Sequence, residues 1–250
     1  MNRLFDTDST LSFTAYSLPH IIALLLLIGL AVALYRYRMP LRDEAKGNWV
    51  RYGLLAILAI SEITLNMWYV TQNRYDVADT LPLELCSISL YMSIFMLLFN
   101  SRGLFQIVYF IGIGGALQAM LTPALSYGFP HYRFIEFFVA HIAIILAVLY
   151  MLWVEQHRPR LKSILFTMVF LNVLLIIISS INKLTGGNYM FLSRKPETAS
   201  LLDVLGPYPW YILSLELVAF AMFLLLYLPF AISNHIHHKQ KKARKTIHHT

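Results

Sequence analysis

The stretch SLPHIIALLLLIGLAVALYR, residues 17–36, decides the fold of this chain. Between Pro19 and Arg36 it is apolar at almost every position. About 20 helical residues cross the ~30 Å hydrocarbon layer of a bilayer, so the stretch has the length of a transmembrane helix. Lipid offers no hydrogen-bond partners to free backbone groups, which excludes an isolated strand there. The stretch therefore predicts a membrane-spanning helix.

Six further apolar blocks of similar length follow, and they agree with the overall composition. Apolar residues make up 58% of the chain and charged residues 13%, against about a quarter charged in soluble domains. We therefore expect an all-α, polytopic membrane bundle of seven transmembrane helices over residues 1–234, with a basic, His-rich tail at 235–250. The predicted helices cover residues 17–36, 49–70, 81–99, 104–124, 134–153, 163–182 and 209–232. Pro159 separates the fifth helix from the sixth.

The basic residues predict the orientation of the bundle. If the N-terminus is outside, fourteen of the twenty Lys and Arg residues fall in the inner segments. The positive-inside rule then places the N-terminus outside and the C-terminus inside, in the cytoplasm. The formal charge of +7 is explained by this orientation, so no nucleic-acid partner is predicted. Cys86 is the only cysteine, which excludes an intramolecular disulfide.

Polar residues gather at one level of the predicted bundle, about 5 to 11 Å below its outer boundary at 1.5 Å per helical residue. Ionisable groups inside a membrane are costly and often functional. We therefore predict a polar cavity that opens outward. The alternative is that these groups bond one another and only hold the bundle together. The residues concerned are Glu62, Asn66, Glu84, Cys86, Gln118, Thr122, His141 and Glu216.

Their spacing along the helices is partly consistent with a common cavity. Glu62 and Asn66 are four residues apart and share a helical face, as do Gln118 and Thr122. Glu84 and Cys86 are two apart and point in different directions on a regular helix. Both face one cavity only if Pro82 distorts the first turn or the cavity wraps around this helix.

The connection 183–208 is long for a helical bundle, and such loops are often lids or binding elements. We expect Asn188, Tyr189, Arg194 and Lys195 to contribute to the binding of a membrane lipid. The two basic side chains would pair with a lipid phosphate at headgroup level. Interfacial anchoring is an equally good explanation of the aromatic residues here.

Three motifs carry a resemblance to a known family: LPLELCS at 81–87, GGNYMFLSRKP at 186–196 and SLLDVLGPYPWYI at 200–212. With His141, they resemble the YwaF-type bacterial integral membrane proteins, whose distant relatives include the animal transmembrane protein 164 family. The likeness covers essentially the whole chain. It implies a multi-pass protein of the bacterial cytoplasmic (plasma) membrane.

The animal relatives are described as lipid acyltransferases that use a cysteine and a histidine. The resemblance thus implies that Cys86 and His141 form a thiol-ester acyl-transfer pair. The cysteine of the animal proteins aligns with Leu83 and the histidine after it with Glu84. Position 86 shares a helical face with position 83. Glu84, which occupies the position of that histidine, is included with Cys86 and His141 among the catalytic candidates.

Three functions remain open. In an acyltransferase, Cys86 attacks an acyl ester and His141 moves its proton. Asn66 or Gln118 could donate to the oxyanion. A proton-coupled small-solute transporter would instead use Glu62, Glu84 and Glu216, and a third possibility is a membrane protein that binds lipid without chemistry. The predicted partners are membrane lipids, and no cofactor or metal is predicted.

Overall fold

The computed structural model describes residues 4–7, 11–195 and 201–247, and over these residues the chain is all-α. Short 3₁₀ turns at Pro40–Arg42, Tyr189–Phe191 and Leu201–Leu205 lie in the connections. Within the described ranges the only extended pairing is a single bridge between Ser12 and Tyr127. The helices are α1 (Leu18–Tyr37), α2 (Glu44–Thr71), α3 (Leu85–Phe99), α4 (Arg102–Leu121), α5 (Tyr132–Trp153), α6 (Leu161–Thr185) and α7 (Trp210–Ile247).

Six of the seven predicted spans are long enough and apolar enough to cross a membrane, and α3 is the exception. It begins at Leu85 rather than at residue 81 and has 15 residues, which is about 22 Å of helix. Residues 81–84 before it are not helical. At the other end of the chain, α7 continues to Ile247 and so includes most of the segment predicted as a basic, His-rich tail.

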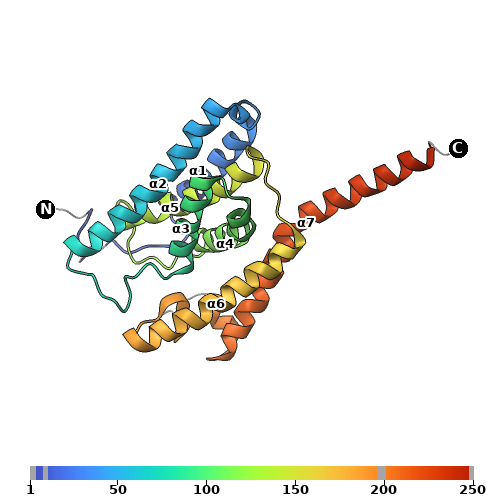
Figure 1. Ribbon diagram of the computed structural model, residues 1–250. Helices are drawn as coiled ribbons and strands as arrows, with labels where there is room; N and C mark the ends of the chain where they lie inside the picture. The colour runs from blue at the N-terminus through green and yellow to red at the C-terminus, as the bar shows by residue number, and fades with distance from the viewer. Residues whose placement is uncertain (1–3, 8–10, 196–200, 248–250) are drawn as a thin grey trace.

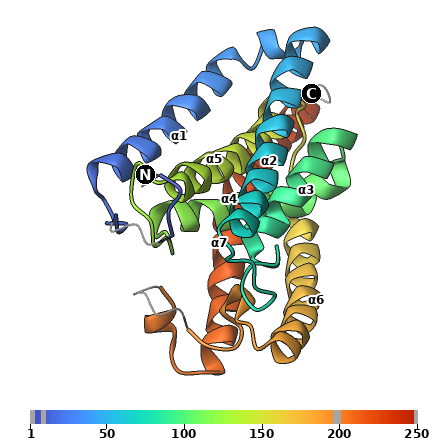
Figure 2. The ribbon, with the colours of Figure 1, turned by 90° about the vertical axis from the view of Figure 1, so that its left-hand side faces the viewer.

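The helices α4 and α5 form the centre of the bundle. Helix α5 packs against α1, α2, α3 and α4, whereas α6 and α7 pack against α4. Figures 1 and 2 show α1 and α2 on one side of this pair and α6 and α7 on the other. Figure 1 also shows α7 running past the bundle toward the C-terminus. The interior of the protein is therefore concentrated where α3 and α2 meet α4 and α5.

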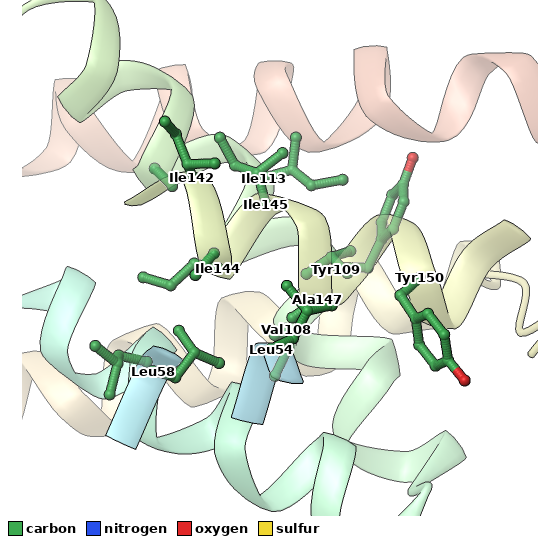
Figure 3. Packing of buried hydrophobic residues seen from close by; sticks show 14 of the residues in the cluster. Leu54, Leu58, Val108, Tyr109, Ile113, Ile142, Ile144, Ile145, Ala147 and Tyr150 are labelled. Atoms are coloured by element: carbon green, nitrogen blue, oxygen red, sulfur yellow. The ribbon is translucent and has the colours of Figure 1, made fainter. Parts of the chain in front are cut away.

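Two glycines let α4 approach α5 on one side and α7 on the other. A Cβ atom on Gly112 would lie 3.3 Å from the side chain of Val148 on α5. One on Gly114 would lie 2.7 Å from Met222 on α7. Around this contact, Val108, Ile144 and Ala147 pack as a fully buried apolar layer (Figure 3). A larger residue at either glycine would require these neighbouring side chains to shift.

Local sequence signals explain most helix ends. Asp43 accepts a hydrogen bond from the Lys46 backbone N–H at the start of α2, and Ser101 accepts one from Leu104 at the start of α4. Asn100 ends α3 and Gly186 ends α6, both with left-handed backbone. The predicted break before α6 is confirmed, because α5 ends at Trp153 and α6 begins at Leu161.

The segment before α1 folds back across the starting end of α5, and we call residues 4–7 and 11–13 the N-terminal strap. The Leu4 carbonyl accepts from the Tyr132 N–H at 2.7 Å, and the Phe5 carbonyl accepts from the Trp68 indole at 3.0 Å. The Leu11 carbonyl accepts from the Gly128 N–H at 2.7 Å. The strap thus joins the end of α2 to the beginning of α5.

Candidate functional site

The start of α3 is shaped by Glu84, which occupies the N-cap position with extended backbone. Its side chain does not cap the helix. Instead, the Glu84 carboxylate accepts a hydrogen bond from the Met190 backbone N–H at 3.1 Å. Because Glu84 precedes the first helical turn, the angle expected between Glu84 and Cys86 on a regular helix does not apply. Residues 81–84 are not helical, so α3 begins at Leu85 rather than with a distorted first turn after Pro82.

Cys86 lies in the first turn of α3, on the face directed into the bundle. Ser89 and Ser93 follow it by three and seven residues and share this face. Both serines are buried, and their hydroxyl groups have no hydrogen-bond partner in the described structure. The sequence analysis overlooked these serines, although their helical spacing from Cys86 is a signal that could have identified them.

His141 lies on α5, which packs against α3. Its ring is 6% exposed, and Nδ1 lies 2.6 Å from the Phe137 carbonyl oxygen. The other ring nitrogen, Nε2, is buried and has no partner among the described residues. No hydrogen bond joins His141 to Cys86 within the described part of the chain. The two residues thus sit on adjoining helices, each with a free polar atom.

Glu62, Asn66 and Tyr91 form a second group, which we call the groove cluster. Asn66 donates to Glu62 Oε1 at 3.0 Å, and the Tyr91 hydroxyl donates to the same oxygen at 2.8 Å. Glu62 and Asn66 therefore share a helical face, as their spacing predicts, and they are also hydrogen-bonded. Tyr91 was not predicted, because only the packing of α3 against α2 brings it to Glu62.

Arg133, Glu136 and Tyr69 form a third group, the paired cluster, which the sequence analysis also overlooked. Arg133 forms a salt bridge with Glu136, and these side chains are 16% and 6% exposed. The guanidinium also lies over the ring of Tyr69, 5.5 Å from its centroid. The signal for this cluster is present in the sequence, since Arg133 and Glu136 are three residues apart at the start of a span.

Two residues of the predicted binding loop instead organise the loop itself. Asn188 Oδ1 accepts from the backbone N–H groups of Ser193 and Arg194. Tyr189 is buried, and its hydroxyl donates to the Val77 carbonyl at 2.7 Å and accepts from the Leu81 N–H at 2.9 Å. These contacts hold the loop against the segment that leads into α3.

The remaining predicted residues are dispersed. Gln118 is exposed and donates to Thr122 at 2.7 Å, which confirms their shared face. Glu216 is partly buried on α7, which packs on α4 and α6 rather than on α2. Arg194 is exposed, and Lys195 lies 5.7 Å from the centroid of the Tyr211 ring. These residues of the predicted polar layer and loop therefore lie on separate parts of the bundle.

Two grooves flank the last turns of α2. One, of about 670 Å³, runs between α2 and α3, and the groove cluster lies in it. The other, of about 650 Å³, lies beneath the N-terminal strap and includes Trp68 and Tyr132. Met67 and Thr71 border both grooves. Within the described residues there is no group of three or more His, Cys, Asp or Glu side chains able to hold a metal ion.

Comparison with known proteins agrees with this architecture. No curated protein and no solved structure matches the chain. A protein-family model does match, over residues 15–227, which span all seven helices up to the middle of α7. With six helices long and apolar enough to cross a bilayer, the chain is a multi-pass membrane protein. The match over most of its length shows that it belongs to the TMEM164 family.

Proposed function

We propose that this protein is an integral membrane lipid acyltransferase in which Cys86 is the nucleophile and His141 its general base. One observation carries the proposal: the buried His141 Nε2 has no partner in the described structure. The same proposal inserts the chain in a bacterial cytoplasmic membrane with its N-terminus outside, from the distribution of basic residues.

The hydrogen bond of the other ring nitrogen determines what Nε2 can do. The Phe137 carbonyl near Nδ1 can only accept a hydrogen bond, so Nδ1 must carry the proton. In the neutral imidazole, Nε2 then bears a free lone pair. This is the tautomer that a general base needs to take a proton from a thiol.

Other buried histidines of the bundle differ in this respect. His20 accepts from the Tyr16 N–H through Nδ1, and its Nε2 lies 2.8 Å from the Met120 carbonyl. His131 is likewise bonded through both ring nitrogens. His157 leaves Nδ1 unpaired, but it lies in the connection after α5, at the opposite end of the bundle. His141 is therefore the better candidate base for Cys86.

The first turn of α3 supplies a candidate oxyanion site. The first N–H groups of a helix have no intrahelical partner, and they favour negative charge. In the described structure no side chain caps this end of α3. The N–H groups near Cys86 are thus available to an oxygen that becomes negative when the thiol attacks an ester. Glu84, bonded to the loop, would hold this turn in position rather than react.

The reaction follows in two balanced steps. In the first, His141 Nε2 takes the Cys86 proton, the sulfur bonds to the ester carbonyl carbon, and the departing alkoxide receives that proton from the imidazolium. In the second, a lipid hydroxyl gives its proton to Nε2 and bonds to the thioester carbon, and the thiolate leaves and is protonated again. A lysolipid departs in the first step, and a newly acylated lipid departs in the second.

The test is acyl exchange between a labelled phospholipid and a lysolipid by protein in nanodiscs. Replacing either member of a nucleophile and base pair costs about 10³-fold or more in rate, so Cys86→Ala and His141→Ala should abolish exchange. The wild type should also carry a hydroxylamine-labile acyl group on Cys86. Asn172→Ala, an exposed position on α6, is the matched control and should retain full exchange. Exchange that survives Cys86→Ala, or no exchange by folded wild type, would contradict the proposal.

A second candidate function, lipid binding without chemistry, is favoured by the groove of about 670 Å³ between α2 and α3. Its size is within the range of ligand sites, roughly 300 to 1,000 Å³. The same nanodisc experiment separates the two functions. A binding protein would retain lipid through purification and would form no acyl group on Cys86.

A further inference from the structure

A small pocket lies at the end of the bundle opposite to Cys86, where α2 begins and where α3 and α5 end. Its volume is about 240 Å³, and its lining includes Asn48 and Arg51 of α2, Asn100 at the end of α3 and Glu155 after α5. Asn100 lies fourteen residues beyond Cys86, which is about 21 Å of helix. The pocket is therefore separate from the proposed reaction centre. In the proposed orientation it faces the cytoplasm.

One side of the pocket presents hydrogen-bond acceptors. The Glu155 carboxylate accepts from the Tyr150 hydroxyl at 3.1 Å and from the Asn100 amide at 2.9 Å, so both of its donors are neutral. No salt bridge to Glu155 is present within the described residues. On the same side, Asn100 Oδ1 is buried and has no hydrogen-bond partner there. This side therefore favours a ligand group that brings N–H donors and a positive charge.

The other side presents donors from α2. Arg51 uses two of its three guanidinium nitrogens to donate to the Leu97 and Leu98 carbonyls at the end of α3. Its third nitrogen, Nη1, has no hydrogen bond among the described residues. Asn48 lies three residues earlier on the same helical face, is partly buried, and has no side-chain hydrogen bond in that part of the chain. A guanidinium fixed in this way is suited to a carboxylate, so this side favours an anionic group.

Gly47 keeps the pocket open between these two sides. A Cβ atom there would lie 2.5 Å from the Leu41 carbonyl oxygen and 3.1 Å from the Tyr150 hydroxyl. The volume of the pocket corresponds to about eight water molecules of about 30 Å³ each. A compact polar molecule therefore fits the pocket, whereas a lipid chain does not.

We propose that this pocket binds a free α-amino acid, with its ammonium group at Glu155 and its carboxylate at Arg51 and Asn48. A cation alone would leave the donors of α2 unpaired and would lie close to the arginine. An anion alone would face the Glu155 carboxylate. Only a small molecule that carries both charges pairs with both sides, and this binding does not depend on the proposed acyl transfer.

The experiment measures binding by saturation-transfer NMR, with the full chain in nanodiscs, where both ends of the bundle are in contact with water. The probes are L-alanine, propionate, which lacks only its ammonium group, and ethylamine, which lacks only its carboxylate. Because each analogue leaves one charged side of the pocket unpaired, the methyl group of L-alanine should be saturated at least about fivefold more than that of either analogue. Nanodiscs without protein give the background.

Glu155→Gln keeps the shape of the side chain and can still accept from Tyr150, but it removes the charge, so the saturation of L-alanine should fall to that of propionate. Asn48→Ala removes a donor that no described contact of the fold uses, and it should also weaken the L-alanine signal, which gives a second measure if Glu155→Gln folds poorly. Lys46→Gln is the control, because it changes one charge at an exposed position of the same turn outside the lining. Its L-alanine signal should equal that of the wild type.

Three results would overturn the proposal. One is equal saturation of the three probes in the wild type. Another is an L-alanine signal that is retained in either folded variant. The third is ethylamine or propionate binding as well as L-alanine, which would show a site for a single charge rather than for an amino acid.

Discussion

The paired cluster and the groove cluster both include residues of α2 and use the same kinds of side chain differently. In the paired cluster, Glu136 forms a salt bridge with Arg133, and both side chains are largely buried. In the groove cluster, Glu62 has only neutral donors and lies in an open groove. Among the described residues, one buried carboxylate is therefore paired with a cation and the other only with neutral donors.

Breaking the paired cluster should have the largest effect on stability. Arg133→Met leaves the Glu136 carboxylate buried without a cation, which costs about 3 to 5 kcal/mol of unfolding free energy. Thermal denaturation in detergent measures this loss. Arg158→Met, at an exposed position between α5 and α6, is the control and should change little. If both variants melt alike, the ion pair is not what stabilises this region.

The groove cluster should be less sensitive. Tyr91→Phe removes one hydrogen bond to a charged group, and such bonds contribute about 1.5 to 3 kcal/mol. We expect a loss at the lower end of this range, because Asn66 still donates to Glu62. Chemical denaturation measures it, with Tyr52→Phe, an exposed ring on α2, as the control. A loss as large as that of Arg133→Met would remove the distinction between the two clusters.

The smallest effect concerns pH and the N-terminal strap beside the paired cluster. Burial lowers the pKa of His131, as does the nearby Arg133, while the Asp6 carbonyl at its ring opposes the shift. Neutral His131 therefore stabilises the folded state. This stabilisation is fully present above the ordinary histidine pKa of about 6.5, and it is lost as the pH falls through the lower pKa that His131 has in the folded protein.

Hydrogen exchange checks this expectation at the Tyr132 amide, which is bonded to the strap at Leu4. Its protection, corrected for intrinsic exchange, should decrease between pH 7.5 and pH 5. The Gln72 amide, bonded within the end of α2, serves as the control and should not change. Protection at Tyr132 that is independent of pH, or that changes equally in His131→Gln, would show that this histidine does not control the strap.

The candidate site was only partly predictable. The sequence pointed to Glu62 and Asn66 as a pair because their contact is local to one helix turn. It pointed to Cys86 and His141 through the family resemblance, and whether they react together remains a prediction. Ser89, Ser93 and Glu136 were overlooked, although their helical spacings were visible. Tyr91 could not have been assigned, since its contact with Glu62 joins residues 29 positions apart.

The sequence by itself determined that this protein is an all-α membrane protein, since apolar length and the breaks at residues such as Pro159 are local properties of the chain. Only the tertiary structure decided that the loop docks with Met190 on Glu84, directly before α3. It also decided that the Glu136 carboxylate pairs with Arg133, whereas the Glu62 carboxylate forms no salt bridge among the described residues. Such pairings depend on how the helices are rotated and packed, and hydrophobic periodicity does not encode the partner of a polar side chain.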